Sequence, residues 1–249
     1  MRKLLILSLL CLASVSSYAE TPEEKGLAIA QEGNRRDNGF GDYSANMTMI
    51  LRNKQGDEST RRIRLAFLEV ANDGDQGLTI FDEPADVKGT ALLTHRHKTG
   101  DDDQWLYLPA LKRVQRITWT NKSGSFMGSE FAFEDLSSQE VEKYRYKHLR
   151  DETYEGQPVF VSERVPVSEY SGYTRQIVWV DQAEYRPWKI EYHDRKGSLL
   201  KTLVLKDYKQ YLGKYWRPNE MLMTNHQTGK STMLKWSGYK FRVGLKPAD

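Results

Sequence analysis

The sequence predicts a mainly β protein of the α+β class, built as one antiparallel sheet that is strongly curved or closed into a barrel. Short segments of alternating apolar and polar residues recur at intervals of roughly 8 to 14 residues, and hairpin-type turns separate them. Only one long segment carries clear helical signals, and neither a repeat nor a linker divides the chain. We therefore expect about ten or eleven strands in a single domain.

The first 19 residues are expected to be a signal peptide. Arg2 and Lys3 form a basic start, residues 4–12 are an apolar run, and residues 17–19 fit a small-x-small cleavage site. The apolar run is much shorter than the roughly 20 residues that a membrane span needs. The expected mature domain then covers residues 20–249.

The single cysteine, Cys11, argues against a lipoprotein. It lies inside the apolar run after two leucines, whereas a lipid-accepting cysteine would follow a small residue. An exported domain without disulfides fits a Gram-negative periplasm, so we expect a soluble periplasmic protein. Loss of Arg2 and Lys3 reduces the formal net charge from +3 to +1 (3 − 2 = 1). This near-neutral balance predicts no binding to nucleic acid.

Residues 21–34 form the clearest predicted helix. Thr21 can cap its start, Pro22 fits the first turn, and Glu23 and Glu24 complement the positive helix end. The apolar face of this helix is thin. We therefore expect the helix to lie against another element rather than to form a core.

From Tyr43 onward, most of the chain has the two-residue period of β-strands. Residues 63–67 place three apolar side chains on one face and arginines on the other, and residues 188–193 alternate in the same way. Turn residues separate these segments throughout the chain. A short helical piece is expected only around residues 137–141.

The stretch from Asp101 to Asp135 organises the chain. Residues 105–108 and 111–119 favour β-structure and flank Pro109, which predicts a tight reversal and a hairpin. Residues 123–133 then mix glycine and serine with large apolar side chains. Such a loop is either an ordinary long loop that buries its aromatic residues or a flexible cover that closes over a ligand.

None of the polar clusters predicts an enzyme. His95 and His97 lie on one strand face before an acidic run and offer a weak zinc hypothesis, but an acidic run after a strand is usually a solvated turn. Glu134 and Asp135 are adjacent, so on a strand they would point to opposite faces. We therefore predict no catalytic residues, no metal and no cofactor.

Soft and aromatic side chains are concentrated on strand faces. The pairs Met47 with Met49, Met221 with Met223, Trp105 with Tyr107 and Trp188 with Tyr192 each share a face. Methionine adapts its shape, so a concave sheet with such a lining can hold an acyl chain. The alternative interpretation is that these residues pack a solid core.

Three motifs resemble a known family. The runs 103–117, 124–129 and 131–135 are similar to the exported outer membrane lipoprotein-sorting protein group, a branch of the LolA-like superfamily. The signal peptide, the N-terminal helix and the β-rich remainder agree with this group. The resemblance implies a half-open antiparallel barrel of about eleven strands, with short lid helices or a loop over an apolar cavity.

The resemblance also implies a lipid or lipoprotein chaperone. Many relatives are encoded beside exporters of the resistance-nodulation-division (RND/MMPL) class. The resemblance therefore implies that the protein carries acyl chains from such a transporter towards the outer membrane. In the carrier LolA, a cavity arginine helps to fasten the lid. Arg52, Arg62 and Arg64 are candidates by position only, because no motif matches them.

The leading hypothesis is a carrier whose cavity is covered by the 123–133 loop and the 21–34 helix. Its glycine-rich and serine-rich loop is the part expected to open. The predicted ligand-binding residues of the cavity and its lid are Met47, Met49, Leu65, Trp105, Tyr107, Phe126, Met127, Phe131, Phe133 and Met221.

A second hypothesis is an interaction or sensor module that resembles RseB. It would dock onto a membrane partner without carrying a lipid. Its cavity would be small or filled, and exposed aromatic residues such as Trp216 or Trp236 would make the contact.

Overall fold

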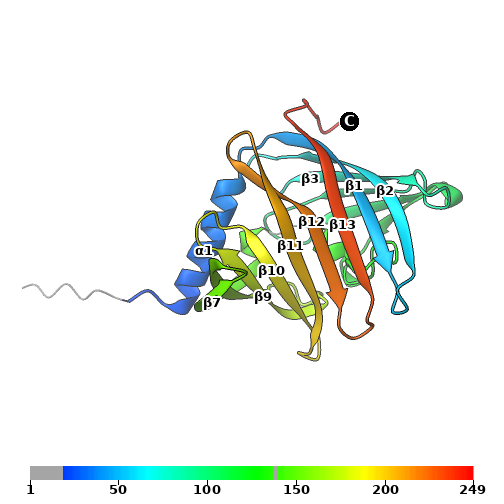
Figure 1. Ribbon diagram of the computed structural model, residues 1–249. Helices are drawn as coiled ribbons and strands as arrows, with labels where there is room; N and C mark the ends of the chain where they lie inside the picture. Colours follow the sequence, from blue (N-terminus) through cyan, green and yellow to red (C-terminus); the bar gives the residue numbers. More distant parts are fainter. Residues whose placement is uncertain (1–18, 137–139, 249) are drawn as a thin grey trace, which may run out of the picture.

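Thirteen antiparallel strands form one sheet in the computed structural model, which describes residues 19–136 and 140–248 (Figure 1). The strands are β1 (Asp42–Arg52), β2 (Glu58–Leu68), β3 (Gln76–Glu83), β4 (Ala91–His95), β5 (Asp103–Leu108), β6 (Arg113–Ile117), β7 (Tyr144–Tyr154), β8 (Gln157–Pro166), β9 (Tyr173–Asp181), β10 (Pro187–Asp194), β11 (Leu199–Tyr211), β12 (Tyr215–Asn225) and β13 (Ser231–Phe241).

Two meanders make up this sheet. The strand order is β6-β5-β4-β3-β2-β1-β13-β12-β11-β10-β9-β8-β7, so β1 pairs with β13 and joins the halves. The edge strands β6 and β7 are not paired with each other, and the sheet stays open. The number of strands, thirteen, exceeds the ten or eleven expected from the sequence.

The N-terminal helix, α1 (Pro22–Asp37), is the only α-helix in the described part of the chain. Elsewhere in that part, the helical segments are four single 3₁₀ turns, η1 (Pro109–Leu111), η2 (Trp119–Asn121), η3 (Phe133–Asp135) and η4 (Val141–Lys143). Regular lid helices are therefore not found there. No described helix is long and apolar enough to cross a membrane. The predicted signal peptide, apart from Ala19, and most of the predicted 137–141 helix lie outside the described residues.

Helix α1 begins as the sequence predicts and lies against β7 (Figure 1). Thr21 and Glu24 form a reciprocal capping box, and Pro22 occupies the first turn. Only Gly26 and Ile29 are buried on this helix. A Cβ atom at Gly26 would lie 2.7 Å from the backbone nitrogen of His148, so glycine permits the close approach to β7.

The inner face of the sheet carries the main apolar cluster. On β1 the row with Met47 and Met49 is buried, and on β2 the row with Ile63 and Leu65 is buried. On β2, Arg62 and Arg64 face outward, because successive strand residues point to opposite faces. The predicted alternation on these two strands is confirmed.

Residues 118–136, the first part of the connection between β6 and β7, are here called the covering loop. Phe126 and Phe131 insert into the main apolar cluster and are 0% and 2% exposed. The buried ammonium of Lys201 on β11 donates to Asp135 Oδ2 at 2.6 Å and to the Glu130 carbonyl at 2.9 Å. Aromatic burial and a buried ion pair therefore both tie this loop to the sheet.

Candidate functional site: an amphipathic cavity under the N-terminal helix

A cavity of about 1260 Å³ lies between the inner face of the sheet, α1 and the covering loop. This volume exceeds the range of about 300–1,000 Å³ that is typical of small-molecule sites. The sheet therefore encloses a large cavity that is partly open to solvent. Its apolar wall includes Met47, Leu65, Leu92, Phe126, Phe131, Val178, Val180, Leu205, Met221 and Leu234.

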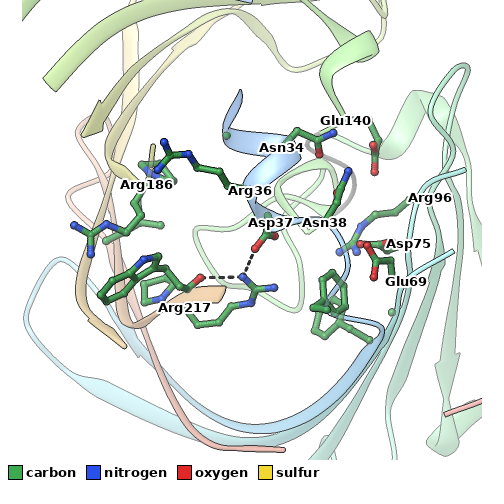
Figure 2. Close-up of a pocket in the computed structure, with 18 of the residues that line it drawn as sticks. Asn34, Arg36, Asp37, Asn38, Glu69, Asp75, Arg96, Glu140, Arg186 and Arg217 are labelled. Atoms are coloured by element: carbon green, nitrogen blue, oxygen red, sulfur yellow. Dashed lines mark hydrogen bonds and ion pairs between the residues drawn. The ribbon is translucent and has the colours of Figure 1, made fainter. Parts of the chain in front are cut away.

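The polar part of the cavity lies beside the C-terminal half of α1. Figure 2 shows Arg96 next to Asp75 and Glu69 on one side, Arg186 on the other, and Arg217 between them. All five residues line the cavity. The cavity thus combines an apolar wall with a polar section rich in arginine.

Arg217 fastens the end of α1 to β12. Its Nη1 atom donates to Asp37 Oδ1 at 2.5 Å and to the Trp216 carbonyl at 2.9 Å (Figure 2). The guanidinium carbon also lies 5.3 Å from the ring centre of Phe40 and 5.5 Å from that of Tyr43. Burial opposes the charge of Arg217, but the attraction of Asp37 and Tyr43 outweighs it, and the pKa of the guanidinium is raised.

Asp75 is an acidic group in a partly desolvated position. Burial raises its pKa to about 6, and Glu140 and Glu69 act in the same direction. Arg96 and the hydrogen bond from the Val70 amide oppose this shift but do not cancel it. The Glu69 carboxylate accepts hydrogen bonds from Gly39 and Gly41 just after α1.

Several buried donors in the walls of the cavity have no acceptor. Six buried side-chain nitrogen or oxygen atoms lack a hydrogen-bond partner within the described protein, and five of them belong to cavity-lining residues. These five atoms are Arg96 Nε, Ser162 Oγ, Arg164 Nη2, Trp216 Nε1 and Trp236 Nε1. Buried polar groups are normally satisfied, so their concentration around one cavity points to an acceptor supplied from outside the chain.

Comparison with known proteins identifies the family. The crystal structure of a domain from Vibrio parahaemolyticus, described as an outer membrane lipoprotein-sorting protein, is 63% identical, covers 91% of this chain and 96% of its own, and gives a TM-score of 0.90. This chain belongs to the outer membrane lipoprotein-sorting protein family. A family model described only as an uncharacterized protein matches residues 73–249.

Two further solved structures are similar to this chain over most of its length. A DUF1329 family protein from Desulfovibrio piger is 30% identical, covers 92% of this chain and 96% of its own, and gives a TM-score of 0.86. A LolA superfamily protein from Nitrosomonas europaea, at 22% identity, covers 90% and 96% with a TM-score of 0.72, and shows the shared fold alone. A search of curated proteins gave no match.

Five of the ten residues predicted to bind the ligand line the cavity. They are Met47, Leu65, Phe126, Phe131 and Met221. Met49 and Phe133 are instead buried in the surrounding apolar cluster, and Met127 packs partly buried against it. The structure places these three residues behind the cavity surface, where they support its wall.

Trp105 and Tyr107 lie on the other face of the sheet, which corrects their predicted position. On β5, Gln104 and Leu106 are the buried residues, and Tyr107 is 38% exposed. Leu106 pairs with Leu92, a cavity residue, and this register sets the face. Both faces of the run 105–108 are apolar, so its alternation does not distinguish the inside from the outside.

The structure also locates the residues of the zinc hypothesis and of the lid-fastening hypothesis. His97 lies between Asp73 and Asp103, with its ring nitrogens 2.9 Å and 3.3 Å from their carboxylates, and His95 packs against Trp105. No group of three or more potential metal ligands was found among the described residues. The three arginines that were candidates for fastening a lid form exposed ion pairs instead: Arg52 with Glu58, Arg62 with Glu83, and Arg64 with Asp82.

The arginines of the cavity were missed by the sequence analysis. Arg96 continues the buried row of Leu92 and Thr94 two positions beyond it, just after the end of β4. Arg164 lies two positions after the buried Ser162 on β8. Extending the two-residue period past the apolar run of β4 would have identified Arg96. On β8 the buried apolar residues Val159 and Val161 belong to a different row from Arg164, so the pattern gave no such signal.

Proposed function

We propose that this protein is a periplasmic carrier that holds the acyl chain of a lipid or lipoprotein inside its cavity. The observation that carries the proposal is the hollow interior of about 1260 Å³ with its apolar wall. Burial contributes about 0.8 kcal/mol per methylene, so ten buried methylenes contribute about 8 kcal/mol before the costs of binding. Membership of a family described as lipoprotein-sorting supports the same role.

The moving cover of the proposed carrier is α1 rather than the covering loop. Two of the ion pairs that hold α1 to the sheet, Lys25 with Asp151 and Glu23 with Lys147, are solvent-exposed, and in another, between Arg217 and Asp37, the carboxylate of Asp37 is half exposed. Exposed pairs contribute little, typically up to about 1 kcal/mol each. Because the attachments of the covering loop are buried, the proposal makes this loop the fixed wall and gives α1 the opening role that the sequence analysis assigned to the loop.

A binding assay tests the carrier proposal. Purified, delipidated protein should take up the neutral fluorescent probe N-phenyl-1-naphthylamine, and long-chain lipids should displace it. Native mass spectrometry of protein from its own host should find co-purified lipid. If the probe does not bind and no lipid co-purifies, the carrier proposal is wrong.

The direction of transport is a further part of the proposal. We propose that the cargo passes from an inner-membrane exporter of the RND/MMPL class to the outer membrane. Crosslinking in cells should then capture such an exporter with the wild-type protein. The RseB-like module is less supported, because Trp216 and Trp236 are partly buried and line the cavity rather than an exposed docking surface.

A further inference from the structure

Two arginines of the cavity wall differ from the others in having no carboxylate partner. Arg217 pairs with Asp37, Arg186 with Asp181, and Arg36 with Glu32 and Glu184. No ion pair within 4.0 Å involves Arg96 or Arg164 in the described part of the chain. Asp75 lies near Arg96 but beyond ion-pair distance, so both guanidinium groups keep donors that an anion could use.

The hydrogen bonds of these two arginines leave donors free. Arg96 Nη2 donates to the Leu136 carbonyl at 3.2 Å, and its Nε has no partner. Arg164 Nε donates to Gln176 Oε1 at 2.7 Å, and its Nη2 has no partner. Ser162 Oγ, two positions before Arg164 on β8 and therefore on the same face, is likewise unpartnered.

The fold brings these groups to one cavity from opposite arms of the sheet. Arg96 follows β4, near the β6 edge, whereas Ser162 and Arg164 lie on β8, next to the β7 edge. All three residues line the same cavity. Arg164 also lies 4.7 Å above the ring of Tyr144, at the start of β7, so its guanidinium is held in place.

We propose that Arg96, Arg164 and Ser162 bind the oxyanion headgroup, a carboxylate or phosphate, of the amphiphile whose chain occupies the apolar part of the cavity. This inference rests on the proposed carrier function and specifies its substrate class. Arginine suits the role because its planar fork of donors matches carboxylate and phosphate oxygens. The lone donors of the indole rings of Trp216 and Trp236 extend the same donor-rich wall.

The acidic groups nearby modulate this site. Asp75 is electrostatically coupled to Arg96, and Glu69 and Glu140 are coupled to Asp75. Glu69 already accepts two backbone hydrogen bonds, which hold it at the end of α1. An incoming anion therefore competes mainly with Asp75 for Arg96, and the variant Asp75→Asn should strengthen binding of the anion without affecting a neutral lipid.

Probe displacement with chain-matched ligands tests the headgroup inference. At about pH 8, where a carboxylic acid is ionised, hexadecanoate should displace N-phenyl-1-naphthylamine at a concentration at least about ten-fold lower than 1-hexadecanol, given the strength of charge-assisted hydrogen bonds. Arg96→Gln and Arg164→Gln should each remove most of this preference and leave hexadecanol unchanged. Arg113→Gln, on the exposed face of β6, is the matched control and should behave as the wild type.

The outcomes separate the two proposals. Equal displacement by hexadecanoate and hexadecanol from the wild-type protein overturns the headgroup inference and leaves the carrier proposal standing, without reliance on any variant. Failure of both lipids, and of the probe itself, overturns both. Inorganic phosphate that raises the melting temperature of the wild type, but not of Arg164→Gln, supports an oxyanion site that works without a chain.

Discussion

The two covers of the cavity are held to the sheet in opposite ways. The covering loop buries Phe126 and Phe131 and is fastened by Lys201 and Asp135, whose side chains are 4% and 3% exposed. Helix α1 buries only Gly26 and Ile29 along its 16 residues, and the carboxylate of Asp37, which pairs with Arg217, is half exposed. The apolar composition of the loop therefore indicates a fixed wall, whereas the thin apolar face of the helix indicates a part that can leave.

In the covering loop, the glycine and serine content alone predicted flexibility, whereas the burial of the aromatic residues indicates a fixed segment. Glycine and serine give the covering loop its turns, and hydrogen bonds within the loop then hold its backbone. Ser125 donates to the Ser129 carbonyl at 2.6 Å, and Ser129 donates to the Phe126 carbonyl at 2.7 Å. The small polar residues of the loop thus satisfy its own buried backbone.

The largest expected effect comes from breaking the attachment of the loop. Lys201→Ala leaves the buried carboxylate of Asp135 without its counterion and should lower the free energy of unfolding by about 3 kcal/mol. Urea denaturation measures the loss, and limited proteolysis should find new cleavage within residues 118–136. Lys206→Ala, which removes an exposed pair with Glu155, is the control and should cost less than about 1 kcal/mol. Equal effects of the two variants would contradict a buried clasp.

Two glycines of α1 provide a matched pair for the helix. A Cβ atom at Gly26 would meet the backbone of β7 at 2.7 Å, whereas one at Gly33 would lie 3.5 Å from the nearest atom, the Tyr185 carbonyl oxygen. Gly26→Ala should displace the helix, cost about 2 kcal/mol and speed up probe exchange. Gly33→Ala should be neutral or slightly stabilising. Stopped-flow fluorescence and denaturation compare them, and slower exchange in Gly26→Ala would contradict a mobile helix.

Asp75 predicts a pH dependence of stability. Its folded-state pKa of about 6 lies above that of the unfolded chain, so the unfolded state loses this proton first as the pH rises from about 4 to 6, and stability falls over that window. Asp75→Asn removes the penalty. The variant should gain on the order of 1–2 kcal/mol over the wild type at pH 8 and nothing near pH 3. Denaturation at both pH values measures the gain, and an equal gain at both would contradict this account.

The cap of α1 has the smallest expected effect. Thr21→Ala removes the capping box with Glu24 and should destabilise the helix by about 1 kcal/mol. If the helix opens independently of the sheet, probe exchange should accelerate by less than about ten-fold while the global unfolding midpoint barely moves. A matching drop in both quantities would mean that helix and sheet unfold together.

Much of the fold could be predicted from local patterns. Thr21, Pro22 and Glu24 define the start of α1, and the alternation around Met47 and Leu65 gives the inner face of β1 and β2 correctly. The turn at Pro109 also lies where it was expected. In each case, residues that are neighbours in sequence determine the outcome.

The rest depends on contacts that no local pattern records. The pairing of β1 with β13 places Met47 opposite Trp236 and turns two meanders into one curved sheet. The face of β5 follows from the register of Leu106 with Leu92, because both of its faces are apolar. Alternation also cannot distinguish a hollow interior from a solid one, and it carries no information on the distant pairing of Lys201 with Asp135.

A reversible crosslink between α1 and the sheet tests the central claim most directly. A Cβ atom at Gly33 would lie 3.8 Å from the Cβ atom of Tyr185, a separation that suits a disulfide, so the variant carrying both Gly33→Cys and Tyr185→Cys can lock the helix. Each single variant is a control. If α1 is the moving cover, the oxidised double variant should exchange N-phenyl-1-naphthylamine much more slowly than the same protein after reduction. Equal exchange rates in the oxidised and reduced forms would contradict the account and return the role of gate to the covering loop.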